Sequence, residues 1–342
     1  MPTFSVDLLT QIAQTLVEGM GTPPDSARRV SSSLVEANLV GHDSHGVMRL
    51  PSYAQFLREG LINPEAQPGI KSRYQATAQI DGRQSWGQLG ARLAAQTAID
   101  LAHQFGLAAI TIDHCVHIGR VGEYVSTISQ AGMVGLAMCN HYPNVAPFGS
   151  RERVMGTNPI AWAVPRASGF EPIVVDFATS AVAEGKLRVA RAKGETVAPG
   201  LIIDSEGRPS QNPLDFYDGG ALLPFGGHKG YGLSLMVELL GGGLSGAAPS
   251  ILPEFAGSNG TVMIALNISA FIPLEQYIAQ VEAFCLRIKA AAPAEGFSEV
   301  LLPGEPELRT RQHRLTEGIP IPETTWQEFR SLAGELKVSL PQ

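Results

Sequence analysis

The chain has 342 residues, of which 44% are hydrophobic and 17% charged, and its formal net charge is −7 at pH 7. This length predicts two or three domains, and the acidic balance argues against a nucleic-acid-binding surface, which normally carries a basic excess. We expect no membrane span, because Glu238 and nearby glycines interrupt the most apolar segment, residues 233–244.

The cysteines and the first residues of the chain indicate a compartment. Cys115, Cys139 and Cys285 are odd in number and widely spaced, which fits a reducing compartment and neither a disulfide framework nor a zinc ribbon. The first residues show no basic start followed by an apolar run, so no signal peptide is expected. Together these features predict a cytoplasmic enzyme.

Residues 5–20, capped by Ser5, and a segment that starts at Pro23-Pro24 are predicted to form helices. The next stretch, residues 41–53, concentrates polar chemistry. If Ser44 caps a helix there, three side chains follow at steps of four and project from one side: His45, Arg49 and Tyr53. An apolar stripe (Val47, Leu50, Ala54 and Leu57) would face a core, and Pro51 would bend the helix.

Two interpretations of this stretch are open from the residues alone. A proton donor one turn from a planar anion-binding group suits an acid–base enzyme that acts on a carboxylate. The alternative is a polar helix start whose histidines only satisfy their neighbours. The Pro/Gly-rich segment 63–69 then predicts a domain boundary.

Beyond residue 70 the pattern becomes mixed, which predicts an α/β or α+β core. Strands are expected at 76–80, 107–112, 133–139, 160–164, 173–176, 201–203 and 261–266. Helices are expected at 89–105, from about 119 to 131, from a cap at Thr179-Ser180 to 191, and at 228–240, 274–292, 305–317 and 323–336.

Two glycine-rich segments differ in what they predict. Residues 241–246 satisfy G-x-G-x-x-G, but they follow a helix where the dinucleotide fingerprint needs a preceding strand, so we reject the motif. Residues 226–232 precede a helix, whose free N–H groups and Lys229 could hold a phosphate. The alternative is a loop with a solvated lysine. Thr179-Ser180 is a second possible anion cradle, although ordinary helix capping competes with it.

A metal site and a serine nucleophile are both disfavoured. Four histidines could suggest a metal site, but no closed ligand set at a common zinc spacing accompanies them: His42, His45, His114 and His117. We therefore predict no metal. No G-x-S-x-G elbow surrounds Ser44 or Ser180, which argues against a serine nucleophile.

Six motifs occur in an order that resembles one family. They are Gly41-His42-Asp43-Ser44-His45-Gly46, His117-Ile118-Gly119, Gly156-Thr157-Asn158-Pro159, Asp176-Phe177-Ala178-Thr179-Ser180-Ala181, Gly227-His228-Lys229-Gly230-Tyr231-Gly232 and Leu302-Pro303-Gly304-Glu305. From about residue 5 to 330 the chain resembles the malate/L-lactate (sulfolactate, ureidoglycolate) dehydrogenases, a non-Rossmann family of NAD(P)-dependent oxidoreductases. It is nearest to their hydroxycarboxylate dehydrogenase branch.

The resemblance implies a fold of mixed α/β class in two parts. Residues 1–72 would form a helical domain that packs with C-terminal helices in residues 305–342. Residues 73–304 would form a mixed-sheet domain that binds the cofactor without a Rossmann motif and makes the contacts of a homodimer. The active site would lie near the subunit interface.

The resemblance also assigns site residues. His45 would donate the proton with Ser44 in its relay, Arg49 would hold the substrate carboxylate, and Thr157 would lie near the substrate. Tyr53 is a candidate substrate neighbour on its helical spacing, and we count His117 among the catalytic candidates. The segments expected to line the cofactor contain His117, Ile118, Gly119, Arg120, Val121, Asp176, Phe177, Ala178, Thr179, Ser180, His228, Lys229, Pro303, Gly304 and Glu305.

The implied reaction is reversible hydride transfer between nicotinamide and C2 of a small 2-oxo or 2-hydroxy acid, with an imidazole that exchanges the proton. The cofactor is NAD or NADP, with NAD slightly favoured, and the sequence does not identify the acid. Lys186 stands where the cyclic-imine (Δ1-piperideine/pyrroline-2-carboxylate) reductases have an acidic relay residue, which weakens that hypothesis. Two hypotheses from different classes are a metal-dependent hydrolase or lyase and a non-catalytic binding protein.

Overall fold

The computed structural model describes residues 2–341, and a seven-stranded sheet lies at its centre. The strand order is β2-β3-β4-β11-β5-β6-β7; β3 and β4 run parallel, and the other neighbours are antiparallel. The strands are β2 (Gly69–Tyr74), β3 (Thr77–Asp81), β4 (Leu107–Asp113), β5 (Met133–Cys139), β6 (Ile160–Val164), β7 (Ile173–Phe177) and β11 (Thr261–Asn267). The predicted mixed α/β class is confirmed.

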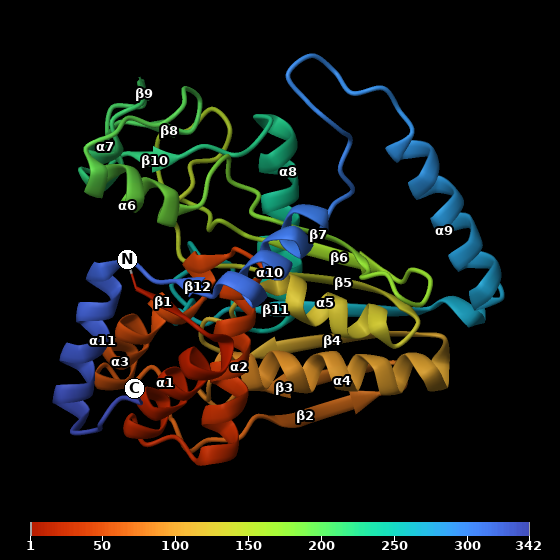
Figure 1. The fold of residues 1–342 in the computed structure, drawn as a ribbon, viewed down its shortest axis with the longest axis horizontal. Helices are drawn as coiled ribbons and strands as arrows, with labels where there is room; N and C mark the ends of the chain where they lie inside the picture. Colours follow the sequence, from red (N-terminus) through yellow and green to blue (C-terminus); the bar gives the residue numbers. More distant parts are fainter. Residues whose placement is uncertain (1, 342) are drawn as a thin grey trace.

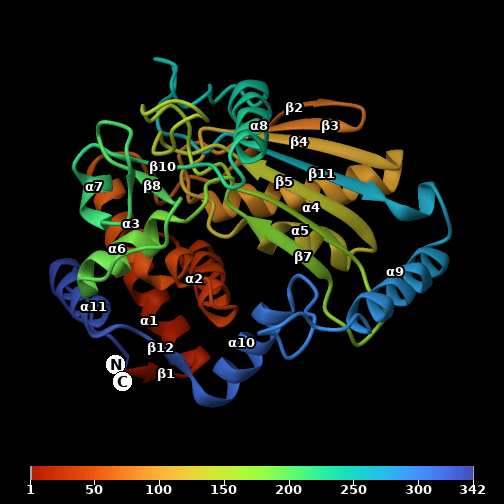
Figure 2. The same cartoon turned by 90° about the horizontal axis from the view of Figure 1, so that it is seen from above.

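The two faces of this sheet are covered differently (Figures 1 and 2). Helices α4 (Gly87–Phe105) and α5 (Val121–Gln130) pack on one face, where alanines of α4 let the helix approach the strands closely. On the other face lie α8 (His228–Val237) and its continuation, the π-helix η3 (Glu238–Leu244). The G-x-G-x-x-G segment therefore lies in and just after a π-helix, in agreement with its rejection as a dinucleotide motif.

A helical lobe brings the two ends of the chain together (Figure 1). Helices α1 (Val6–Gly19), α2 (Pro24–Leu39), α3 (Leu50–Arg58) and α11 (Glu323–Leu336) share one apolar core. Strands β1 (Thr3–Phe4) and β12 (Ile319–Pro320) pair, and the rings of Phe4 and Trp326 lie 4.9 Å apart. Because β2 begins at Gly69 and joins the sheet, the boundary expected at residue 72 falls inside that strand.

A smaller lobe is built from short elements around a core of its own. It contains α6 (Glu184–Lys193), α7 (Pro213–Tyr217) and a three-stranded sheet of β8 (Ile202–Ile203), β9 (Pro209–Ser210) and β10 (Ala221–Leu222). The remaining elements are η4 (Ile268–Ala270), α9 (Leu274–Lys289) and α10 (Glu305–Glu317). In Figures 1 and 2, α9 stands at the edge of the molecule, far from the helical lobe.

The structure confirms the predicted strands and most helices, and it corrects two helix starts. Ser44 caps no helix: residues 43–49 form two 3₁₀ turns, η1 (Asp43–His45) and η2 (Val47–Arg49), before α3 begins at Leu50. Pro51 lies in the first turn of α3, where its missing N–H costs no hydrogen bond, so it does not bend the helix.

The second correction concerns Thr179 and Ser180. Helix α6 begins at Glu184 with Ala183 as its capping residue, and both hydroxyls donate elsewhere: Thr179 to the Thr157 carbonyl and Ser180 to the Val182 carbonyl. The sequence pattern did not indicate β1, β2, β9, β10, β12 and α7. Among the described residues, the structure contains no helix with the length and apolar character needed to cross a membrane.

Candidate active site

Asn38 determines the shape of the segment that contains His45. Its side-chain oxygen accepts a hydrogen bond from the Val47 N–H at 2.8 Å, and its amide donates to Asp43 at 2.6 Å. A Cβ at Gly46 would lie 2.1 Å from that oxygen, so only glycine fits there. Arg314 of α10 binds both carboxylate oxygens of Asp43, at 2.6 and 3.0 Å. Asp43 therefore supports the turn through Asn38 and Arg314, and it is not one of the candidate catalytic side chains.

Three imidazoles gather above this turn. The rings of His45 and His117 stack with centroids 5.5 Å apart and an interplanar angle of 24°. The Ser44 hydroxyl lies 2.9 Å from His45 Nδ1, so the structure brings the expected relay pair together. His141, which follows β5, lies close enough to influence the pKa of both other imidazoles. Among the described side chains, no carboxylate lies within hydrogen-bonding distance of Ser44 or His45.

A hydrogen-bonded chain holds the ring of His117 in place. The Gln88 amide donates to the Tyr53 hydroxyl at 2.9 Å, and this hydroxyl lies 2.8 Å from His117 Nδ1. Burial raises the pKa of Tyr53 to about 12, so the phenol keeps its proton. The phenol can accept this hydrogen bond and still exchange a second one with His117 Nδ1, as donor or acceptor according to the tautomer of the imidazole. Tyr53 thus orients His117.

Arg49 is held with most of its guanidinium free. Its Nε donates to the Ser44 carbonyl at 2.6 Å, and no carboxylate among the described residues pairs with it. Burial lowers the pKa of Arg49, and the charge of Arg188 on α6 lowers it further. Arg49 nevertheless stays protonated at neutral pH, because an arginine pKa starts far above 7. The geometry suits a planar anion such as a carboxylate.

Burial also makes the imidazoles weak bases. It lowers the pKa of His45 to about 3 and that of His141 to about 4, and the positive charge of Arg49 is the second cause in each case. The pKa of His117 falls well below its usual value for the same two reasons. All three rings are therefore neutral at pH 7 in the protein without substrate.

Three of the expected cofactor segments meet at one pocket of about 360 Å³. Its lining includes Arg120 at the start of α5, Asp176 at the end of β7 and Gly304 before α10. The Gly122 N–H donates to Asp176 at 2.7 Å, which joins two of these segments. Glu305 does not line the pocket, because its carboxylate binds Lys289 at 2.7 Å. Of the nearby expected residues, Ile118, Gly119, Val121 and Thr179 are buried, and Phe177 packs edge-on against Trp162 and Phe225.

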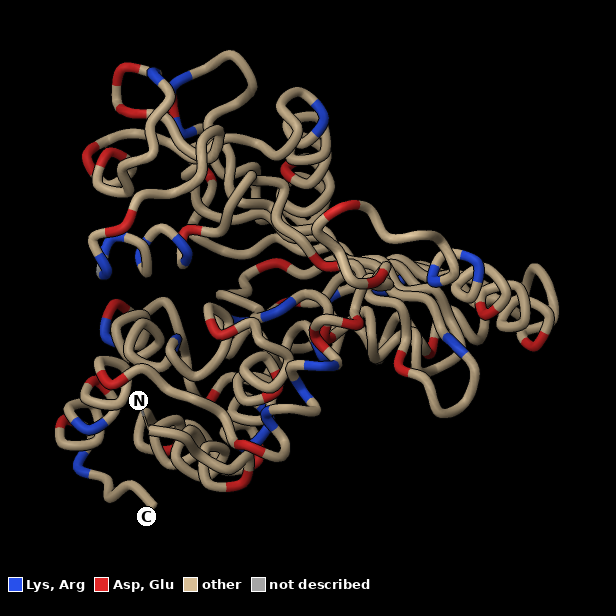
Figure 3. The backbone as a smooth tube through the Cα atoms, turned by 45° about the horizontal axis from the view of Figure 1, so that its top comes forward, with Lys and Arg blue, Asp and Glu red and all other residues tan. Residues whose placement is uncertain are grey.

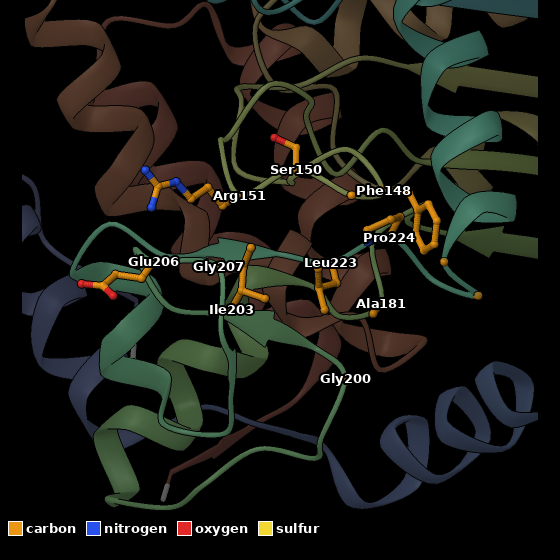
Figure 4. Close-up of a pocket in the computed structure, with 13 residues that line it drawn as sticks. Phe148, Ser150, Arg151, Ala181, Gly200, Ile203, Glu206, Gly207, Leu223 and Pro224 are labelled. Carbon is orange, nitrogen blue, oxygen red and sulfur yellow. The ribbon is translucent and has the colours of Figure 1, made fainter.

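The other expected cofactor residues lie at the start of α8, beside a second pocket of about 590 Å³ (Figure 4). Gly226 and Gly227, which precede His228 and Lys229, have positive φ angles of 56° and 62°. Gly227 lines this pocket, and Phe148 on its wall contacts the His228 ring edge-on, with centroids 6.1 Å apart. Phe225 N–H donates to the Thr179 carbonyl, which brings this turn next to the 176–180 segment.

The histidines considered for a metal site lie in different places. His114 lies with Asp81 and Asp113, its Nδ1 3.4 Å from each carboxylate, and the ammonium group of Lys71 already balances Asp113 at 3.0 Å. His42 lies 3.4 Å from Glu307. Only His45 and His117 belong to the stacked group, so the structure gives no support to a metal site built from all four.

Comparison with known proteins assigns this arrangement to a family. The model of the malate/L-lactate dehydrogenase family matches residues 4–330. The chain belongs to the malate/L-lactate dehydrogenase family. Hydroxycarboxylate dehydrogenase B of Escherichia coli O157:H7 is 36% identical over 97% of this chain and 94% of its own length.

Solved structures agree with this membership. A structure described as a putative malate/lactate dehydrogenase from E. coli superposes with a TM-score of 0.93 at 36% identity, covering 99% of this chain and 96% of that one. The Δ1-piperideine-2-carboxylate reductase of Pseudomonas syringae pvar. tomato superposes with a TM-score of 0.85 at 31% identity, covering 97% and 100%. The resemblance predicted from the motifs is therefore confirmed.

Sequence reasoning missed several residues that the structure places in or behind this site: Gln88, His141, Arg188 and Glu238. His141 carried one usable signal, because it lies two residues after the predicted strand 133–139, where functional loops often begin. Gln88 and Arg188 had none, since each lies in an ordinary helical pattern. Glu238 was noticed only as the charge that interrupts an apolar run.

The depressed pKa values predict acid sensitivity. In the unfolded chain these histidines bind a proton near pH 6.5, whereas the folded protein keeps them neutral. The contribution of these histidines to the free energy of unfolding is therefore complete above pH 6.5. It falls as the pH drops from 6.5 toward 4, by up to about 1.4 kcal/mol per pH unit for each histidine. His141→Gln should reduce this slope in urea unfolding measured at pH 7.5, 6 and 5. The matched control is exposed His103→Gln, and equal slopes in all three proteins would contradict the assignment.

Proposed function

We propose that the protein is an NAD(P)-dependent oxidoreductase that transfers a hydride between nicotinamide and C2 of a small 2-oxo or 2-hydroxy acid. The observation that carries the proposal is the stacked His45–His117 pair beside the free guanidinium of Arg49, in a chain of this family. When bound, nicotinamide supplies the hydride or accepts it. Every other requirement of the reaction can be met by side chains already described.

The pocket formed by Arg120, Asp176 and Gly304 supports a dinucleotide. Arg120 Nε is buried there without a hydrogen-bond partner, and the Asp176 carboxylate can accept a hydroxyl hydrogen. These residues fit one half of NAD or NADP. The anionic part of the cofactor would bind to His228-Lys229 at the start of α8. Ser180, Ala178 and Pro303 complete the proposed cofactor-binding set.

In the proposed mechanism, Arg49 binds the substrate carboxylate through two parallel hydrogen bonds and so fixes which face of C2 is presented. His45, with Ser44 at its Nδ1, exchanges the proton with the C2 oxygen. His117, held by the Tyr53 hydroxyl at its Nδ1, lies beside His45. Thr157 lies near the substrate in this mechanism. Its backbone carbonyl accepts a hydrogen bond from the Thr179 hydroxyl.

Removing the acid–base group should abolish most turnover. General acid–base catalysis contributes about 10²- to 10⁴-fold, so His45→Ala should lower kcat by that factor while cofactor binding survives. The assay follows NADH or NADPH absorbance with a panel of 2-oxo acids, and cofactor binding is measured separately by fluorescence titration. Exposed His103→Ala is the control. Turnover near the unmodified level in His45→Ala would refute the role of His45.

The second candidate function is cyclic-imine reduction, which the structural likeness to the piperideine-carboxylate reductase favours. The same cofactor and the same Arg49 contact would serve a cyclic imine carboxylate. Parallel assays with 2-oxo acids and cyclic imines separate the two reactions. Activity that is lost with chelator and is independent of NAD(P)H would instead indicate a metal-dependent hydrolase or lyase.

We propose NAD rather than NADP as the cofactor, from the charges of the 360 Å³ pocket. The pocket is lined by five carboxylates, those of Glu36, Glu123, Glu171, Asp176 and Glu307. It is lined by only three guanidinium groups, those of Arg92, Arg120 and Arg311. Arg92 and Arg311 are already paired, with Glu123 at 3.2 Å and with Glu36 at 3.4 Å. A ribose hydroxyl suits such a pocket, whereas a 2′-phosphate would meet excess negative charge.

The charge argument predicts a measurable preference. kcat/KM for NADH should exceed that for NADPH by about tenfold or more, which corresponds to about 1.4 kcal/mol. Glu171→Gln removes one carboxylate from the pocket and should narrow the ratio, whereas exposed Glu152→Gln, outside it, should leave the ratio unchanged. A preference for NADPH in the unmodified protein would overturn the proposal.

We also propose a homodimer, because apolar side chains are exposed on α9 and on the α8–η3 helix. Phe284 and Leu286 on α9 are 66% and 70% exposed, and Leu239 and Leu244 on η3 are 52% and 65% exposed. Large exposed apolar patches on a soluble chain usually mark protein interfaces. A second copy of the chain is the partner that the family membership supports.

The dimer proposal predicts that the protein elutes at twice the chain mass in light-scattering chromatography at micromolar concentration. Leu286→Glu should shift the mass toward that of one chain, because it places a charge in a buried interface. Exposed Leu315→Glu on α10, outside these two surfaces, is the control. A single-chain mass for the unmodified protein would contradict the proposal.

A further inference from the structure

Helix α10 packs against α2 and against the turn that leads to the proposed acid–base histidine (Figures 1 and 2). A Cβ at Gly41 would lie 3.1 Å from the Cγ2 atom of Thr310, so the backbone of this turn touches α10. Thr310 and Arg314 are four positions apart and therefore share one face of the helix. Both side chains meet the segment that joins α2 to η1.

The guanidinium of Arg314 closes this contact with three hydrogen bonds. It donates to both carboxylate oxygens of Asp43, at 2.6 and 3.0 Å, and to the backbone carbonyl of Asn38. Only 13% of the Arg314 side chain is exposed, so water screens these bonds less than those of an exposed ion pair. A bidentate contact between a guanidinium and a carboxylate fixes direction as well as distance.

Residues 43–49 depend on such side-chain contacts because they form no α-helix. They form two 3₁₀ turns, whose hydrogen bonds have poorer geometry than those of an α-helix. Asp43 accepts one more hydrogen bond, from the Asn38 amide at 2.6 Å. Ser44 and His45 follow Asp43 directly in the chain, and the Ser44 hydroxyl lies 2.9 Å from His45 Nδ1. A displacement of Asp43 would therefore move the proposed relay pair.

The same helix forms part of the wall of the 360 Å³ pocket proposed for the cofactor. Four residues at the start of α10 or just before it line this pocket: Gly304, Glu307, Leu308 and Arg311. His42, which precedes Asp43, also lines the pocket and lies 3.4 Å from Glu307. Acidic and basic residues lie close together in this part of the molecule, between the helical lobe and the sheet (Figure 3). Arg314 follows Arg311 by three positions, so one face of α10 extends from the pocket to the turn.

We propose that Arg314 is a positioning residue, which acts through Asp43 to place Ser44 and His45 relative to the cofactor pocket. This inference rests on the proposed function, because it takes His45 as the acid–base group. A misplacement of about 1 Å can slow a catalysed step about 10²-fold. Arg314 thus controls turnover although it lines neither of the two pockets described above.

The test compares kcat and cofactor binding in variants of the full-length protein. Arg314→Gln should lower kcat about 10- to 100-fold and leave the Kd for the nicotinamide cofactor, measured by fluorescence titration, within about twofold. Arg314→Lys keeps the charge but not the bidentate contact, so it should restore part of the loss. Asp43→Asn weakens the same ion pair without altering α10 and should also lower kcat. The matched control is Arg309→Gln, which removes an exposed guanidinium paired with Glu299 from the same helix.

A double substitution shows whether Arg314 acts through His45. When Arg314→Gln is added to His45→Ala, the residual turnover should change less than about twofold, because the group that Arg314 positions is already gone. Circular dichroism and thermal unfolding verify that each variant has folded. If Arg314→Gln does not fold, Arg314→Lys and Asp43→Asn provide the same comparison.

The outcomes separate this inference from the proposed function. The role of Arg314 is overturned, and the dehydrogenase proposal stands, if kcat of folded Arg314→Gln stays within about twofold of the unmodified value. The same holds if Arg309→Gln loses as much kcat, if the cofactor Kd rises as much as kcat falls, or if the loss is equal with and without His45. No turnover of any 2-oxo acid by the unmodified protein with either cofactor is the failure of the proposed function itself.

Discussion

The buried carboxylate of Glu238 is the constraint on which the site depends. It accepts hydrogen bonds from the Gly156 N–H at 3.1 Å, the Asn158 amide at 2.8 Å, and the N–H and hydroxyl of Ser250 at 2.8 and 2.7 Å. Asn158 in turn accepts from the His141 N–H at 3.2 Å. One side chain on η3 therefore fixes both the turn that carries Thr157 and the backbone of His141. A buried donor left unpaired costs about 1–3 kcal/mol, so these contacts must be satisfied together.

The fold could be predicted where local signals and packing agree. Residues 323–336 were predicted as a helix with the bounds that α11 has. Near Ser44 the local signal was misleading. A cap residue before an apolar stripe normally starts a helix, but Asn38 takes the Val47 N–H and draws Asp43 back toward α2. Contacts between segments decide the conformation there, and a single sequence does not display them.

The same distinction applies to the site. His45, Arg49 and His117 stand in short motifs whose spacing and resemblance make them visible. Gln88 acts through Tyr53, 35 positions away, and Glu238 acts on a turn more than 80 positions away. Such residues are defined by what they contact, so their sequence surroundings look like ordinary helix. Glu238 did leave a trace, since a lone carboxylate inside an apolar run must find buried donors. That rule predicts that hydrogen-bond donors surround the Glu238 carboxylate, but it does not say which residues supply them.

The electrostatics of the cluster couple substrate binding to acid strength. In the proposed mechanism Arg49 holds a carboxylate, yet its charge is one reason that the pKa of His45 is only about 3. A carboxylate on Arg49 cancels part of that charge, so the pKa of His45 rises when the substrate is in place. In the free enzyme the imidazole is neutral. In the proposed complex with an oxo acid it becomes able to hold the proton that reduction requires. The group that we propose to bind the substrate would thus also adjust the pKa of the proposed acid.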